Sequence, residues 1–208
     1  MASFPVFLRD KRNGQTVPAV LVETIDESHL RCIETAWMPV LIRRVKELVD
    51  QGEPRQAWPQ SWHWDWRAKM DRINGLLAFR TFALLCQGEV QGLMQINTAR
   101  NVCRLPVQAG KHLAYVDYVE TAPWNRRTIV AEPRFGGVGV VMIRVAIEIS
   151  QDEGFHGRVG LHSLPQSESF YSAACGMTDL GIDGTKENLR YFEMTSEQAT
   201  EFSGQGKP

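Results

Sequence analysis

The sequence lacks the features that mark membrane, secreted and metal-binding proteins. No apolar run approaches the roughly 20 residues that cross a bilayer. Charged residues interrupt the N-terminus before a signal-peptide hydrophobic segment develops. The four cysteines form no C-x-x-C pair, and the five histidines have no paired ligand spacing. We therefore expect a cytoplasmic protein with reduced thiols, no membrane partner and no metal.

A surplus of basic residues is also missing. The chain has 23 Lys and Arg against 24 Asp and Glu, a formal net charge of −1. General nucleic-acid binding requires an excess of positive charge to neutralise phosphates, so it is not expected. There are no repeats or low-complexity segments. We expect a single domain over residues 1–195, followed by a short helix and disordered tail over residues 196–208.

The N-terminal third predicts a hairpin and helices. Residues 4–25 read as two strands around Asn13-Gly14, a dipeptide typical of tight primed turns. Thr24-Ile25-Asp26-Glu27 resembles a helix start. The helical spacing that follows contains Pro39, which predicts a kink or two helices. The Trp-rich helical region 53–75 then predicts a second helix over residues 64–73.

The remaining elements alternate between strands and helices. Strands are expected over residues 77–86, 90–97, 113–121, 158–162, 177–182 and 189–194. A largely apolar helix is expected over residues 137–153, with a polar stripe of Arg144, Glu148 and Asp152. Ser163 to Gln166 form a capping box that predicts a further helix to Ala174.

The Gly-rich segment from Arg134 to Val140 joins the third of these strands to the apolar helix. Glycines at such a turn let a ligand approach the backbone closely. The first turn of the helix offers unpaired N–H groups and a positive dipole end. Together these features favour a bound phosphate or pyrophosphate, although a plain Gly-rich turn has the same composition.

With Arg134-x-x-Gly137-x-Gly139 in this position, nearly the whole chain resembles the GCN5-related N-acetyltransferase (GNAT) superfamily. The stretch from Ala122 to Arg126 and the stretch from Gly160 to Pro165 resemble bacterial members of it. The resemblance implies a mixed α+β fold. Its central, mostly antiparallel twisted sheet has about six or seven strands, splayed between the fourth and fifth, with about four flanking helices.

The resemblance also implies a site for acetyl-CoA, or coenzyme A, as co-substrate. Pantetheine would lie in the splay, between residues 119–121 and 159–161, and the pyrophosphate on N–H groups of the glycine turn. Arg126 and Arg127 are candidates for the remaining phosphate, unless they are merely solvated. The implied cofactor-binding residues are Val119, Thr121, Arg134, Phe135, Gly136, Gly137, Val138, Gly139 and Val140.

Tyr171 is the residue that the resemblance offers as the acid for the departing thiolate. Phe170-Tyr171 followed by Gly176-Met177 is similar to the family motif. The spacing from Tyr171 to Gly176 is one residue longer than usual, and Leu164 stands where the family has asparagine. The alternative role of Tyr171 is a half-buried aromatic that packs its helix.

Glu120 and Asp117 are the candidate bases for the acceptor amine. Side chains of a strand alternate, so these two carboxylates point to opposite faces and only one faces the acceptor. Glu120, nearest the splay, is our choice. A solvated or arginine-paired carboxylate is the alternative.

Acceptor contacts are expected from Trp62, Trp64, Trp124 and His162. The clustered tryptophans predict either core packing or an aromatic wall for a cationic amine. His162 ends a strand and is either a base, a substrate contact or a satisfied polar residue. The insertion over residues 124–133 either covers the cofactor, shapes the acceptor pocket or is a surface loop.

Two functions follow from this pattern. The first is direct acetyl transfer to a primary amine of a small molecule, peptide or protein, and the second is a non-catalytic CoA-binding or acyl-CoA-binding regulatory module. A dinucleotide-binding oxidoreductase is disfavoured, because Met142 occupies the third glycine position and the preceding strands read as antiparallel. A homodimer is possible within the family.

Overall fold

The computed structural model describes residues 2–99 and 101–204. These residues form two compact units. The first comprises the described residues of Met1–Leu76, Thr81–Met94 and Val119–Gly139, and the second those of Leu77–Arg80, Gln95–Tyr118 and Val140–Pro208.

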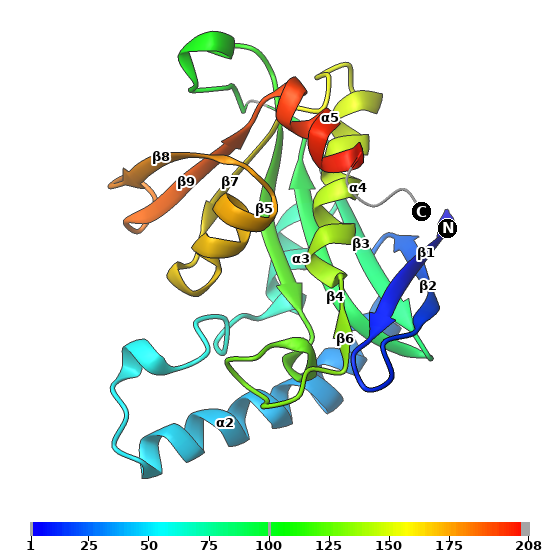
Figure 1. Cartoon of the computed structure of the whole chain (residues 1–208), viewed down its shortest axis with the longest axis vertical. Helices are drawn as coiled ribbons and strands as arrows, with labels where there is room; N and C mark the ends of the chain where they lie inside the picture. Colours follow the sequence, from blue (N-terminus) through cyan, green and yellow to red (C-terminus); the bar gives the residue numbers. More distant parts are fainter. Residues whose placement is uncertain (1, 100, 205–208) are drawn as a thin grey trace. The chain divides into compact units, whose positions relative to one another are not determined.

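The described strands follow the hydrogen-bonded order β6-β1-β2-β3-β4-β5-β7-β9-β8 (Figure 1). Their bounds are β1 Ser3–Asp10, β2 Thr16–Glu23, β3 Phe79–Cys86, β4 Glu89–Asn97, β5 Ala114–Thr121, β6 Phe135–Gly136, β7 Val159–Ser163, β8 Thr178–Asp183 and β9 Leu189–Met194. The helices are α1 Glu27–Cys32, α2 Met38–Asp50, α3 Trp66–Ile73, α4 Val138–Asp152 and α5 Ser196–Gly204.

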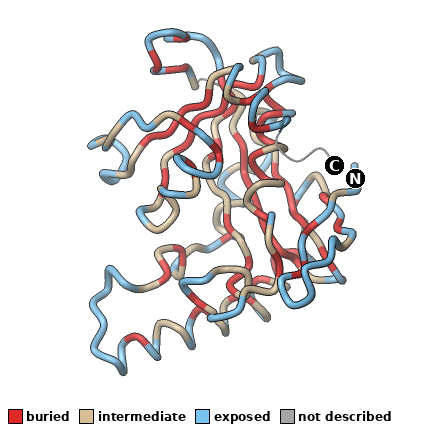
Figure 2. The backbone as a smooth tube through the Cα atoms, viewed as in Figure 1, coloured by how far each residue is buried: buried red, intermediate tan, exposed pale blue. Residues whose placement is uncertain are grey.

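This is the mixed α+β fold class expected from the sequence. The described residues form nine strands and five α-helices, where about six or seven strands and about four helices were expected. The pairs β1–β2, β1–β6, β2–β3, β7–β9 and β8–β9 are antiparallel, and β5–β7 is parallel. Buried residues run along β3 and β4, which Figure 2 draws mostly in red. Strands buried in this way hold the core of the fold.

In the first unit, the N-terminal hairpin is present but its turn differs from the prediction. Asp10 N–H donates to the Gln15 carbonyl at 2.8 Å, which leaves a loop of residues 11–14 between the strands. The type I′ primed turn needs positive φ at both central residues, and of Asn13 and Gly14 only Gly14 has it. Two successive residues with positive φ occur between β3 and β4, where Gln87 and Gly88 have φ of 53° and 78°.

The first helical segment of this unit contains the expected interruption. Asp26, within the predicted helix start of residues 24–27, is the N-cap of α1, and its side chain accepts from the backbone N–H groups of Ser28 and His29. A π-helical turn, Ile33–Trp37, separates α1 from α2, and Pro39 stands in the first turn of α2. Proline is tolerated there because first-turn N–H groups have no intrahelical acceptor.

In the second unit, α4 is buried on most of its surface, as its apolar sequence predicts. Met142, Ile143 and Ala146 are fully buried. Arg144 is half-buried and Glu148 is exposed, which agrees with the expected polar stripe.

The parallel pairing of β5 with β7 is short. It joins Ala114 to Val159 and ends at Val116 with Leu161, although β5 continues to Thr121 and β7 to Ser163. The strands therefore part after Val116 and Leu161, which is the expected splay. Residues 159–161, predicted to line the gap, are instead the paired part of β7.

The segment after β7 is helical but not a regular α-helix. The Ser163 hydroxyl donates to the Leu164 carbonyl at 2.9 Å, and Leu164 is an N-cap without a side-chain hydrogen bond. The helical turn therefore has Leu164, and not the predicted Ser163, as its N-cap residue. A 3-10 turn, Pro165–Ser167, and a π-helical turn, Phe170–Ala174, follow.

At the C-terminus, α5 is the expected short helix. The sequence predicts a tail that begins at Gly204, which is instead the last residue of α5, and residues 205–208 lie outside the described residues. Within the described part of the chain, no helix is both long and apolar enough to span a membrane.

Candidate functional site

The glycine turn lies between β6 and α4 in the first unit. Gly137 has φ of +94°, a conformation that side chains rarely adopt, and α4 begins at the next residue. The N–H groups of Val138, Gly139 and Val140 belong to the first helical turn, which provides no intrahelical acceptors. The backbone thus begins a helix at the position where the sequence predicts an anion site, and anion binding there stays a prediction.

Arg134 is bound to the β3–β4 turn. Its guanidinium donates to the carboxylate of Glu89 and, at 2.8 Å, to the side-chain carbonyl of Gln87. It also lies over the ring of Phe135, with 4.9 Å from Cζ to the ring centroid. The charge predicted to face a pyrophosphate is therefore already paired with a carboxylate.

The start of the insertion over residues 124–133 is hydrogen-bonded to the residues that directly follow its end. Arg134 N–H donates to the Trp124 carbonyl at 3.0 Å, and Phe135 N–H donates to Asn125 Oδ1 at 2.9 Å. Trp124 Nε1 and Asn125 Nδ2 both donate to Oε1 of the fully buried Gln91. The insertion thus fixes the glycine turn, and it engages the N–H of Phe135, one of the predicted anion contacts.

Lys11 brings a second cation to this turn, which the sequence analysis missed. Its backbone N–H donates to the Arg134 carbonyl at 2.9 Å. A Cβ placed on Gly136 would lie 2.6 Å from Lys11 Cε and 3.3 Å from Nζ. The lysine side chain therefore lies against Gly136, immediately before the start of α4. A lysine in a hairpin loop gives no sequence signal for this position.

Glu120 lies in a buried hydrogen-bonded group. Its carboxylate accepts from Trp66 Nε1 at 2.6 Å and lies 3.8 Å from Arg126 Nη1, which donates to the Ser61 hydroxyl at 2.8 Å. Burial raises the pKa of Glu120 above its ordinary value, although hydrogen bonds from Ser61 and Trp66 oppose this. Burial lowers the pKa of Arg126, and the charge of Glu120 opposes that shift.

Arg126 is thus the partner of Glu120 and not a solvated surface residue, whereas Arg127 is exposed. The remaining candidate tryptophans of the first unit have separate neighbours. Trp62 packs edge-on against Trp58, Trp64 lies under the ammonium of Lys69 at 4.8 Å, and Trp124 packs edge-on against Trp37.

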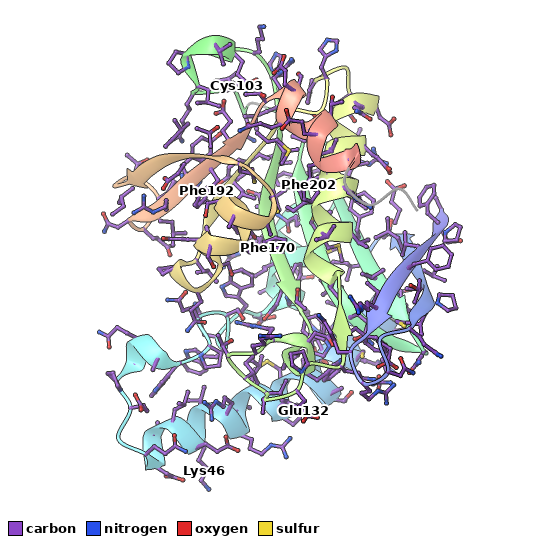
Figure 3. The ribbon with its side chains drawn as sticks, viewed as in Figure 1. Lys46, Cys103, Glu132, Phe170, Phe192 and Phe202 are labelled. Carbon is purple, nitrogen blue, oxygen red and sulfur yellow. The ribbon has the colours of Figure 1, made fainter. Side chains whose placement is uncertain are left out.

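Tyr171 lies in the second unit, in the π-helical turn. Its ring packs on Phe170 and on Phe192 of β9, with centroids 5.2 and 5.9 Å away; both phenylalanines are labelled in Figure 3. Burial raises the pKa of Tyr171, so the phenol is held in its protonated form. Cys175 N–H donates to the Phe170 carbonyl, an i→i+5 bond that accommodates one more residue than an α-helical turn.

His162 belongs to a polar group on the face of β7 and β9 opposite to the one on which Tyr171 packs against Phe192. Its Nδ1 lies 2.5 Å from the Tyr115 hydroxyl and its Nε2 lies 3.1 Å from Asp183 Oδ2. Asp117 follows Tyr115 by two residues, on the same face of β5. Burial raises the pKa of Asp117 to about 6, opposed by a hydrogen bond from Gln95.

In the described parts of the chain, no group of three or more His, Cys, Asp or Glu side chains is arranged to hold a metal ion. The four cysteines are free.

Comparison with known proteins identifies the fold. No protein-family model matches the sequence, and no curated protein matches it. The GNAT domain of S. lividans PAT has 13% identity and a TM-score of 0.52, over 92% of this chain and 96% of that one. Spermidine N-acetyltransferase from Vibrio cholerae has 14% identity and a TM-score of 0.52, over 86% and 98%.

A third structure is FeeM, an N-acyl amino acid synthase from uncultured soil microbes. It has 12% identity and a TM-score of 0.53, over 88% of this chain and 93% of that one. At these identities the likeness concerns the fold. The chain has the GNAT fold, as the sequence motifs predict.

The buried hydrogen bond from Trp66 Nε1 to Glu120 can be tested for its contribution to stability. Trp66→Phe keeps an aromatic ring but removes the donor, leaving a buried carboxylate oxygen without it, and we expect a loss of about 1–3 kcal/mol in unfolding free energy. Urea unfolding measures the change. Trp64→Phe, at a half-buried ring, is the control and should cost less. Equal losses in both variants would contradict a specific role for the indole N–H.

Proposed function

We propose that the protein is an acetyl-CoA-dependent N-acetyltransferase that acts in the cytoplasm on a primary amine of a small molecule, peptide or protein. The observation that carries the proposal is the Gly137 turn opening α4 in a GNAT fold whose β5–β7 pairing ends at Val116 and Leu161. The GNAT resemblance implies that the Gly137 turn is the pyrophosphate position and, separately, that the end of the β5–β7 pairing is the pantetheine position.

Two neighbours with the same fold were determined with this cofactor. The Vibrio cholerae spermidine N-acetyltransferase is in complex with CoA and spermine. Mycobacterium smegmatis RimJ is in complex with CoA-disulfide, at 14% identity and a TM-score of 0.50, over 97% of this chain and 92% of that one. Both support CoA as the ligand, and the first supports an amine as the acceptor.

The proposed reaction is a direct transfer. The acceptor nitrogen bonds to the thioester carbonyl carbon, the carbon–sulfur bond breaks, and the thiolate takes a proton. Tyr171 is the proposed source of that proton, since burial keeps its phenol protonated. Its longer spacing to Gly176 is accommodated by the π-helical turn. Glu120 remains the proposed base from the sequence, and its raised pKa supports that role.

The alternative function is a non-catalytic CoA-binding module. The contact between Glu120 and Arg126 favours this alternative. A carboxylate that accepts from Trp66 and lies near an arginine stabilises the fold and is not free to act as a base. The test is thiol release from acetyl-CoA across a panel of amines, beside calorimetry of CoA binding. Transfer to any amine supports the enzyme. Binding without thiol release from every amine supports the module.

Gly137→Glu tests the pyrophosphate position. A carboxylate at the start of α4 opposes a bound anion, and we expect the Kd for CoA to rise more than about 100-fold. Gly75→Glu is the control for backbone strain, because Gly75 has φ of +77° and open space around it. The affinity is measured by calorimetry. An unchanged Kd in Gly137→Glu would show that CoA does not bind at this turn.

Lys11→Ala tests the cation beside Gly136. We propose that Lys11, rather than Arg134, provides the positive charge for the pyrophosphate, so its loss should weaken CoA binding about tenfold. Arg12→Ala removes the same charge one residue away, from a guanidinium bound to Asp10 at 2.6 Å. Equal losses in the two variants would indicate only a long-range electrostatic effect.

Tyr171→Phe tests the acid. It preserves the ring packing on Phe170 and Phe192 and removes only the hydroxyl. We expect kcat for thiol release to fall about 100-fold with the Kd for CoA unchanged. An unaffected kcat would remove Tyr171 from the mechanism.

A further inference from the structure

Tyr115, His162 and Asp183 form a continuous hydrogen-bonded chain that the proposed transfer has not used. The three residues come from β5, β7 and β8, and all belong to the second unit. The Tyr115 hydroxyl lies 2.5 Å from His162 Nδ1, and His162 Nε2 lies 3.1 Å from Asp183 Oδ2. The His162 side chain is 4% exposed, so its ring nitrogens depend on these partners.

The partners determine the direction of the hydrogen bonds. Hydrogen bonds from Thr185 and Arg104 lower the pKa of Asp183, so its carboxylate is ionised and only accepts. His162 Nε2 must then carry the hydrogen and Nδ1 the lone pair. The Tyr115 hydroxyl therefore donates to Nδ1, and its oxygen keeps lone pairs free to accept a proton.

The His162 imidazole is in the neutral form that can accept a proton. Burial lowers the pKa of His162, opposed by the Asp183 hydrogen bond, so the imidazole is neutral near pH 7. Burial, and after it the charge of Asp117, raise the pKa of Tyr115, which keeps its proton until another arrives. Tyr191 packs on the His162 ring at 4.8 Å, and the positive charges of Arg104 and Lys186 also face the imidazole.

Beside these three residues, the fully buried Glu193 already provides a carboxylate that stabilises the fold. Its carboxylate accepts from the backbone N–H groups of Arg104 and Leu105 and from the side chains of Gln108 and Tyr191. The Glu193 carboxylate therefore has hydrogen-bond donors within the protein for both of its oxygens. The Tyr115 end instead faces the half-buried Asp117, at the point where β5 leaves β7.

We propose that Tyr115, His162 and Asp183 form a proton relay that deprotonates a cationic amine acceptor held by Asp117. The relay replaces Glu120 as the base, because the Glu120 carboxylate accepts from Trp66, lies near Arg126 and points to the opposite face of β5. The inference rests on the proposed acetyltransferase function. As the acceptor ammonium loses its proton to the Tyr115 oxygen, the phenolic proton passes to His162 Nδ1. The imidazolium so formed is stabilised by Asp183 through Nε2–H. Tyr115 touches the acceptor, and His162 and Asp183 act through it.

The test compares Tyr115→Phe and Asp183→Asn with the controls Tyr118→Phe and Asp179→Asn. Asp179 lies on β8 and pairs with Arg190, outside the relay. With the best amine of the panel, we expect kcat to fall at least about 50-fold in Tyr115→Phe with the Kd for CoA unchanged. Asp183→Asn should lower kcat and move the acid limb of kcat/KM to lower pH, because the anion that raises the pKa of His162 is gone.

The outcomes separate the relay from the function on which it rests. Retained CoA affinity and unfolding midpoint in Tyr115→Phe show that the variant is folded. An active wild type with normal kcat in Tyr115→Phe, or an unmoved pH profile in Asp183→Asn, overturns the relay alone. Losses of equal size in the two controls also overturn it. A wild type that binds CoA but acetylates no amine overturns the function, and the relay with it.

Discussion

The start of α4 depends on the hydrogen bonds that hold residues 134–136. Trp124 and Asn125 accept the N–H groups of Arg134 and Phe135, and Lys11 donates to the Arg134 carbonyl. These bonds place Gly137 where positive φ turns the chain into the helix. The free N–H groups of α4 are thereby presented by a rigid base, as anion binding without reorganisation requires.

Local patterns in the sequence predicted most of this architecture. Apolar periodicity located the strands and α4, and the glycine motif located the helix start. Local signals failed at two turns. Asn13 does not have the positive φ of a type I′ turn, and its side chain accepts from the Gln15 N–H. After β7, Leu164 and not Ser163 is the N-cap residue. Both differences concern the conformation of one residue, which a pattern over many residues does not resolve.

The partners of the site residues could not be predicted, because they are distant in sequence. Arg134 meets Glu89 across 45 positions, and Trp66 meets Glu120 across 54. The motif names Arg134 as a cation but not the carboxylate that neutralises it. Asp117 and Glu120 look alike in sequence, yet one lies beside a Tyr–His–Asp chain and the other beside Arg126. Which carboxylate is free to act is decided by the fold.

The π-helical turn Phe170–Ala174 has a consequence for how this chain relates to proteins of the same fold. One added residue in an α-helix rotates everything before it by about 100° about the axis. The i→i+5 bond from Cys175 to Phe170 absorbs that residue within a single turn. An added residue at this position is therefore taken up inside the helical turn, before β8 begins. The spacing between Tyr171 and Gly176 can thus lengthen by one residue without a new loop.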